Sequence, residues 1–261
     1  MAFIDFLALQ EALLLIATAI VGFVGLNVYW AMRHNDAAGV KSALKGGAVP
    51  IGSIGAIATT LAVWAETTWP FPAIPGTDLA SYNILFTDVY LLFGLTLVIL
   101  AVMMAFHLKL AYAGLFAFVA GAVTMGYGWN GYILHMTKEP LETFLMYLAF
   151  GGVGIFSFPV TIMTDHFLAH PDGTAFAFGT PSPAARSRPS FSVASRAVQP
   201  VVPGTNPEST EAAEPTFRGK FHLPVYVTAY TGFFLLVVGL AGYAAFAYLL
   251  ATLPGHLISA P

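Results

Sequence analysis

Acidic residues stand near the ends of long apolar runs in this 261-residue sequence. Glu11 lies about one turn into the first run, Glu66 closes the second, Asp88 lies about one turn into the third, and His135 follows the fourth. If the runs are antiparallel helices, these four side chains lie at similar depth, where carboxylate oxygens and an imidazole can bind a divalent cation or accept a proton. The alternative is that each carboxylate caps a helix or faces interfacial water, since the helix dipole favours a negative charge in the first turn. We call Glu11, Glu66, Asp88 and His135 the carboxylate set.

Histidines collect at the opposite ends of the same runs. The histidine set comprises His34, His107, His166 and His170, and Asp165 lies among them. His166 and His170 are four residues apart, so both face one side of a helix and can share a metal. His34 and His107 are the first pair for a b-type haem, which needs two facing imidazoles and no cysteine. The alternative is structural, because histidine is favoured by the dipole at a helix C-terminus.

Motifs of the common soluble enzyme classes are missing from the sequence. It contains no GxSxG elbow, no HExxH zinc motif, no Walker lysine and no dinucleotide fingerprint. It also contains no cysteine, which excludes disulfides and thiolate metal sites. We therefore do not expect a free-standing enzyme.

The composition indicates which elements must position these side chains. Hydrophobic residues make up 57% of the chain and charged residues only 9%, whereas soluble domains carry about 25% charged residues. A membrane helix needs about 20 apolar residues, and six runs approach or exceed that length, at about 7–32, 49–65, 84–106, 110–127, 144–165 and 223–253. The sequence predicts an all-α, polytopic integral membrane bundle of about six transmembrane helices.

The basic residues predict the direction of threading. Every lysine and arginine except Lys138 follows the first, third or fifth run. Since such residues are retained in cytoplasmic loops, both termini and the carboxylate set are expected outside and the histidine set inside. The predicted location is the cell membrane, crossed several times.

Residues 171–221 differ from the rest of the chain in being rich in Pro, Ser and Ala. We interpret them as a cytoplasmic segment, disordered or used for docking, between helices one to five in 1–170 and a sixth helix with an outer tail in 222–261. Small residues on the helices predict close helix contacts; they are Gly52 and Ala56, then Ala113, Ala117 and Gly121, then Gly232, Gly239 and Gly242.

One stretch of the sequence resembles a known family. TWPFP at 68–72, YNILFTD at 82–88 and LLFG at 91–94 are similar to the signature of the archaeal and bacterial membrane proteins called domain of unknown function 981. In physical terms, Trp69 anchors the loop at the interface, its prolines stiffen it, and Asn83 is the expected N-cap of the third helix. The resemblance implies a multi-helix membrane protein and supplies no activity. The 171–221 segment departs from it.

These observations favour an accessory or binding subunit of a membrane complex over a catalyst. The complex would be oxidoreductase-associated, with haem b or a divalent metal held by one of the two sets. The alternative is a small proton- or cation-coupled permease that uses the carboxylate set. The expected partners are the lipid bilayer and other membrane subunits, contacted through Gly and Ala helix faces and the 171–221 segment. A net charge of −3 argues against nucleic acid.

Overall fold

The computed structural model of the protein describes residues 6–68, 84–137, 139–170 and 225–258. Its elements, in chain order, are α1 Phe6–Arg33, α2 Ala37–Thr68, a π-helical turn η1 Ile84–Asp88, α4 Val89–Ala105, α5 Leu110–Ile133, α6 Pro140–Ala169 and α7 Val225–Ile258. The described part of the chain is helical and contains no strand, so the expected all-α fold is confirmed.

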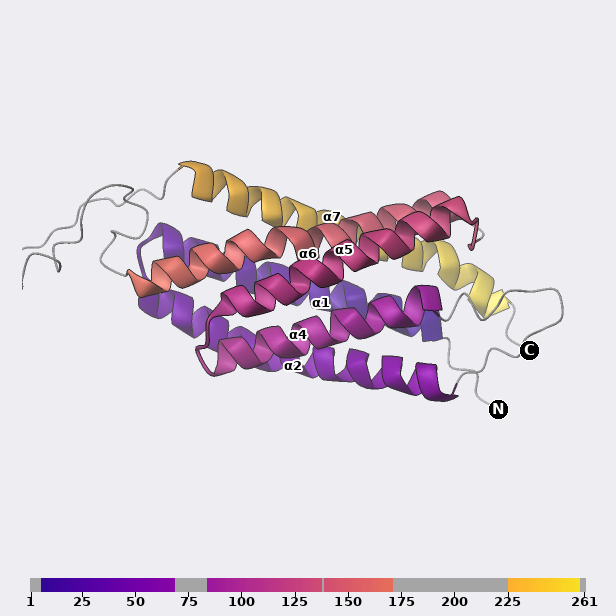
Figure 1. The fold of residues 1–261 in the computed structure, drawn as a ribbon, viewed down its shortest axis with the longest axis horizontal. Helices are drawn as coiled ribbons and strands as arrows, with labels where there is room; N and C mark the ends of the chain where they lie inside the picture. The colour runs from indigo at the N-terminus through magenta and orange to yellow at the C-terminus, as the bar shows by residue number, and fades with distance from the viewer. Residues whose placement is uncertain (1–5, 69–83, 138, 171–224, 259–261) are drawn as a thin grey trace, which may run out of the picture.

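The six long helices form a closed ring. Each helix packs against the next one along the chain, from α1 through α2, α4, α5 and α6 to α7, and α7 packs back against α1. Figure 1 shows them side by side along one axis, with successive helices running in opposite directions. We call the end of the ring where α1 starts and α7 ends the carboxylate end, on the right in Figure 1. The other end, with the turns after α1 and α4, is the histidine end.

All six helices are long and apolar enough to cross a membrane. Their outward faces carry large apolar side chains that a water-soluble protein would bury; among the most exposed are Phe23, Val49, Phe106, Tyr112 and Tyr243. Trp64 and Trp129 are exposed at the carboxylate end, and Trp30 is exposed at the histidine end. This pattern of an apolar girdle with tryptophans at both rims fits a protein surrounded by lipid.

Glycines set the two closest helix pairs. A side chain at Gly154 of α6 would meet the backbone of Ala117 and Gly121 on α5. A side chain at Gly55 of α2 would meet the backbone of α4 near Gly94. Backbones approach this closely only where Cβ atoms are missing, which is how helices associate in lipid.

The small residues predicted for α5 are confirmed as contact positions, and those of α2 and α7 only in part. Gly52 of α2 lies against Ala101, whereas Ala56 is exposed. Gly242 of α7 lies against Thr18 of α1, but Gly232 and Gly239 have no described atom near the position of a Cβ. Two of the three glycines of the α7 row therefore face away from the ring.

Two helices extend furthest beyond their apolar runs. The second run was expected from about residue 49, yet α2 begins at Ala37. Asp36 explains the early start, because its Oδ1 accepts a 2.8 Å hydrogen bond from the Gly39 amide and caps the helix. The fourth run was expected to end near 127, but α5 continues to Ile133. The interpretations of the 171–221 segment, of Trp69 and of Asn83 fall outside the described residues.

Candidate functional site

The structure brings two members of the carboxylate set together. Glu66 at the end of α2 and Asp88 at the end of η1 lie close enough for their carboxyl groups to interact electrostatically. The Asp88 side chain does not cap α4. Its Oδ2 instead accepts a 2.8 Å hydrogen bond from the hydroxyl of Tyr127 on α5.

The other two members of the set occupy different surroundings. Glu11 is buried at 4% exposure beside the equally buried Gln10. His135 is exposed and follows α5 with a left-handed φ of 49°. Among residues 6–68, 84–137, 139–170 and 225–258, no group of three or more histidine, aspartate or glutamate side chains is arranged to hold a metal ion. The divalent metal site is therefore left without support.

The histidine set lies at the helix ends predicted for it, with every member exposed. His34 rests on the ring of Trp30, with 4.9 Å between centroids. His166 and His170 are neighbours on one face of α6, 4.7 Å between ring centroids. His107 has a left-handed φ of 53°. Exposed positions at a helix end supply no buried pocket for a haem.

His107 and His135 share a structural role that the sequence reading did not identify. Each is the residue directly after a helix C-cap, Phe106 for α4 and Leu134 for α5. The next amide bonds back to a carbonyl five residues earlier, Leu108 to Met103 and Met136 to Gly131. This is the hydrogen-bond pattern of the Schellman motif, which requires a left-handed residue. Both histidines therefore end helices.

Asp165 also has a structural role. Its Oδ1 accepts from the Leu110 amide at 3.0 Å and its Oδ2 from the Ala111 amide at 2.8 Å. A carboxylate of α6 thus caps the first turn of α5, from 54 and 55 residues along the chain. Both oxygens of its carboxylate are thus engaged with backbone amides.

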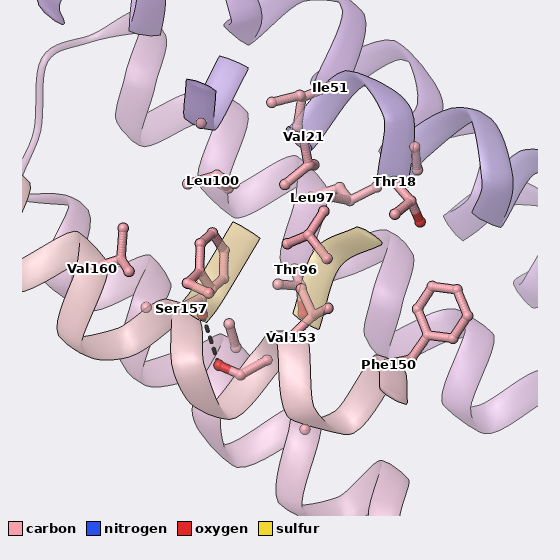
Figure 2. Close-up of a pocket in the computed structure, with 18 of the residues that line it drawn as sticks. Thr18, Val21, Ile51, Thr96, Leu97, Leu100, Phe150, Val153, Ser157 and Val160 are labelled. Carbon is pink, nitrogen blue, oxygen red and sulfur yellow. Dashed lines mark hydrogen bonds between the residues drawn. The ribbon is translucent and has the colours of Figure 1, made fainter. Parts of the chain in front are cut away.

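A cavity of about 240 Å³ runs inside the ring. All six long helices contribute to its lining. Figure 2 shows side chains of α1, α4 and α6 that point into the same space, among them Val21, Leu97 and Val153. At the carboxylate end the lining includes Glu11 and Tyr90, and toward the histidine end it includes Met104. We call this space the central cavity.

Most hydroxyl groups in the lining are bonded to their own helix. The pattern is a side-chain oxygen donating to a carbonyl three or four residues earlier at 2.7–2.9 Å, seen at Thr18, Thr96, Thr124, Ser157, Thr161 and Thr164. The Ser157 bond is drawn in Figure 2. Because these donors are already used, the walls of the central cavity offer mainly apolar contacts.

Two buried tyrosines line the central cavity, a position that the sequence did not predict for either of them. Tyr147 of α6 is 3% exposed and donates a 2.7 Å hydrogen bond to the Leu85 carbonyl. Tyr90 of α4 is also 3% exposed, but its hydroxyl has no hydrogen-bond partner among the described residues. In the sequence, Tyr90 stands two residues after Asp88. That spacing does not show which face of the helix the tyrosine lies on.

Comparison with known proteins identifies the family. The family model described as "Protein of unknown function (DUF981)" matches residues 1–172. The chain belongs to the DUF981 family. The family segment contains α1 to α6, including the carboxylate pair Glu66 and Asp88, and ends before α7. No curated protein and no solved structure matches the chain.

Proposed function

We propose that this DUF981 protein binds a long-chain, lipid-like molecule in its central cavity. The observation that carries the proposal is the closed ring of six apolar helices around an elongated space. Binding of such a molecule would be a specific form of the accessory or binding role expected from the sequence. The protein would act in the cell membrane by holding or presenting such a molecule.

The shape of the central cavity fits a chain. Along α4 the lining extends from Val89 to Met104, which at ~1.5 Å per residue is a distance of roughly 20 Å. Most of the lining groups are aliphatic or aromatic. A compact polar ligand would leave most of such a surface without contacts.

The volume also favours an occupant. An empty cavity costs stability because the atoms lining it lose dispersion contacts. At ~24 cal/mol per Å³, a dry cavity of 240 Å³ would cost about 6 kcal/mol. Lipid chains surround the protein and can supply the missing contacts.

The same lining argues against a path for ions through the ring. A cation crossing an apolar space needs oxygen ligands or water along its route. Most groups that line the central cavity are aliphatic or aromatic, so the lining offers no continuous row of oxygen ligands among the described residues.

The proposal is tested by filling the central cavity. Val153→Phe on α6 introduces a ring at a position whose side chain points into this space. Ile162→Phe is the matched control, because it places the same ring on the outward face of the same helix at a side chain that is 44% exposed. Both variants are purified in detergent, extracted with organic solvent, and the co-purified lipids are quantified by mass spectrometry against protein.

The expected result is a stoichiometric apolar molecule in the wild type and in Ile162→Phe, reduced several-fold in Val153→Phe. Equal retention in all three would contradict the proposal, as would a wild-type protein with no bound molecule. Helical content by circular dichroism checks that the Phe variants are folded.

The permease alternative rests on a separate observation, the paired carboxyl groups of Glu66 and Asp88 with Tyr127 bonded to Asp88. If this pair exchanges a proton or cation, Glu66→Gln and Asp88→Asn should abolish cation-dependent uptake into proteoliposomes without lowering expression. If both variants behave as the wild type, the pair is structural.

The accessory role in an oxidoreductase complex has its own tests. Haem bound by the histidine set would give a Soret band in the purified protein, and its absence would remove haem. Partner subunits that dock on Gly and Ala helix faces or on the 171–221 segment should co-purify in mild detergent.

A further inference from the structure

A second space lies on the outer surface of the ring at the carboxylate end. It is a groove of about 360 Å³ between η1, α5 and the turn that follows α5. Its residues on α5 share one helix face, with a spacing of three and four positions: Val123, Gly126, Tyr127 and Asn130. Gly126 and Asn130 are exposed, so the described residues leave the groove open on its outer side. We call it the outer groove.

The outer groove and the central cavity share a wall. In η1, Leu85 lines the outer groove and the next residue, Phe86, lines the central cavity. In α5, Tyr127 lines the outer groove and Thr124, about one turn earlier, lines the central cavity. Neighbouring residues of the same two elements therefore face different spaces. At the carboxylate end, η1 and this part of α5 stand between the cavity and the groove.

The η1 part of this wall is short and irregular. It is a five-residue π-helical turn that leads directly into α4, and such turns are rare and often occur at functional sites. Leu85 within it is 2% exposed. Its methyl groups lie 3.2–3.3 Å from the position that a Cβ would take at Gly131 of α5. At this point the contact between η1 and α5 is apolar.

Two tyrosine hydroxyls fasten η1 to the helices beside it. Tyr127 of α5 donates a 2.8 Å hydrogen bond to Asp88 Oδ2, and Tyr147 of α6 donates a 2.7 Å bond to the Leu85 carbonyl. The Tyr147 bond is buried, whereas the Tyr127 bond is only partly buried and its donor lines the outer groove. The Tyr127 bond is therefore the fastening that lies nearer the surroundings.

The helix pairs on either side of this wall are held more tightly. Gly55 and Gly94 bring the backbones of α2 and α4 together, and Gly121 and Gly154 do the same for α5 and α6. Backbones in such close contact cannot separate without losing many packing contacts at once. The seam between α4 and α5 is the least extensive of the six in the ring. The ring is thus easiest to part where η1 meets α5.

The lining of the outer groove suits an apolar molecule. Leu85, Val123 and Met136 contribute apolar surface. The Asn130 amide is engaged within its own helix, because its Nδ2 donates a 2.8 Å hydrogen bond to the Gly126 carbonyl. A hydrocarbon chain can pass such a surface without displacing water from an unpaired polar group. These outward-facing walls favour entry from the acyl chains of the bilayer over entry from water.

We propose that η1 is a gate between the outer groove and the central cavity, through which the apolar molecule held in the cavity enters and leaves. The bond between Tyr127 and Asp88 keeps the gate closed, and breaking it lets η1 move away from α5. This inference rests on the proposed function and adds the route by which the bound molecule exchanges with the membrane.

Exchange of a bound alkane tests the gate. Purified protein in detergent micelles is saturated with hexadecane and mixed with an excess of perdeuterated hexadecane, and native mass spectrometry follows the mass of the bound molecule with time. The total amount bound gives the occupancy, and the replacement of the light form gives the exchange rate. A gate changes the exchange rate and leaves the occupancy unchanged, because it acts on entry and exit alike.

Tyr127→Phe removes the hydroxyl that bonds to Asp88 and keeps the ring. We expect it to speed exchange by about 3- to 10-fold, the effect of one lost hydrogen bond on the barrier to opening, at unchanged occupancy. Tyr112→Phe is the matched control on the same helix, because that tyrosine is 65% exposed and lines neither space. It should exchange at the wild-type rate.

Gly126→Trp should have the opposite effect. It places a large ring in the outer groove at a position with no described atom near the missing Cβ, so the ring obstructs the groove without a clash. We expect exchange to slow several-fold at unchanged occupancy. Gly239→Trp is the matched control, because this glycine of α7 is equally unobstructed and lines neither space.

The inference is overturned if either variant exchanges at the rate of its control or departs from it in the opposite direction, since the molecule then uses another route. It is also overturned if Tyr127→Phe lowers the occupancy without speeding exchange, which would make the bond part of the structure of the cavity. In these cases hexadecane still binds and the proposed function stands. A wild-type protein that binds no hexadecane would instead remove the proposed function, and the gate with it.

Discussion

Removing the carboxylate of Asp165 should loosen the junction between α6 and α5. In the wild type its two oxygens accept hydrogen bonds from the amides of Leu110 and Ala111 at 3.0 and 2.8 Å. Lys109, the residue at the N-cap position of α5, provides no side-chain cap. Asp165→Ala therefore leaves the first turn of α5 with free amides and also breaks a contact between neighbouring helices.

The expected loss follows from the number and type of bonds. Replacing an N-cap acceptor by alanine costs ~1 kcal/mol, and hydrogen bonds to charged groups are worth more than neutral ones, so two of them at a half-buried helix start give about 2–3 kcal/mol. Asp36→Ala is the control. It removes a single bond, to the Gly39 amide, from an exposed carboxylate, and should cost about 0.5–1 kcal/mol.

The free energy of unfolding of both variants is measured by equilibrium unfolding in mixed micelles. Sodium dodecyl sulfate is the denaturant, and helicity is the signal. Asp165→Asn keeps one carbonyl oxygen and should fall between the wild type and Asp165→Ala. The reasoning is refuted if Asp165→Ala unfolds at the wild-type midpoint, or if it costs no more than Asp36→Ala.

Three further outcomes are expected. His107→Gly and His135→Gly should each raise the free energy of unfolding by roughly 1 kcal/mol, because glycine adopts the left-handed conformation without strain; a lower midpoint, or loss of a bound chromophore, would show a role beyond ending the helix. In the cysteine-free chain, Asn130→Cys should react with a membrane-impermeant maleimide on intact cells and Lys109→Cys should not, as the predicted threading requires; the reverse labelling would invert the topology. Deleting residues 175–215 should leave an accumulating six-helix protein with wild-type helicity, and failure to accumulate would make that segment part of the fold.

The spans and the ends at which polar residues lie were predictable from the sequence. A hydrocarbon layer demands long apolar helices, so six such runs determine the helix count almost alone. Strict alternation of direction then places Glu66 and Asp88 at one end and His34 at the other. Local signals such as Asp36, which precedes an Ala- and Gly-rich stretch, are in principle enough to predict where a helix starts. The predicted start of α2 was too late because it was taken from the apolar run and not from this N-cap residue.

Side-chain partners across the ring were not predictable. The cap on α5 comes from Asp165, more than 50 residues away. No residue near Lys109 in the sequence predicts it. Tyr90 and Tyr147 look alike as buried aromatics, and only the packed helices show that one hydroxyl is bonded and the other is not. The central cavity is likewise a property of the ring as a whole, because it depends on how six faces fit together.

The place of α7 in the ring has a consequence for the wider family. The family segment ends at residue 172, yet α7 is the helix that joins α6 to α1. Its residues in the lining of the central cavity are Thr231, Phe234, Leu235 and Val238. A relative built from the first five spans alone would have a trough open sideways to the acyl chains of the bilayer, so any molecule it held would exchange freely with the surrounding membrane. By packing against both α6 and α1, α7 closes that opening and separates the central cavity from the acyl chains on this side.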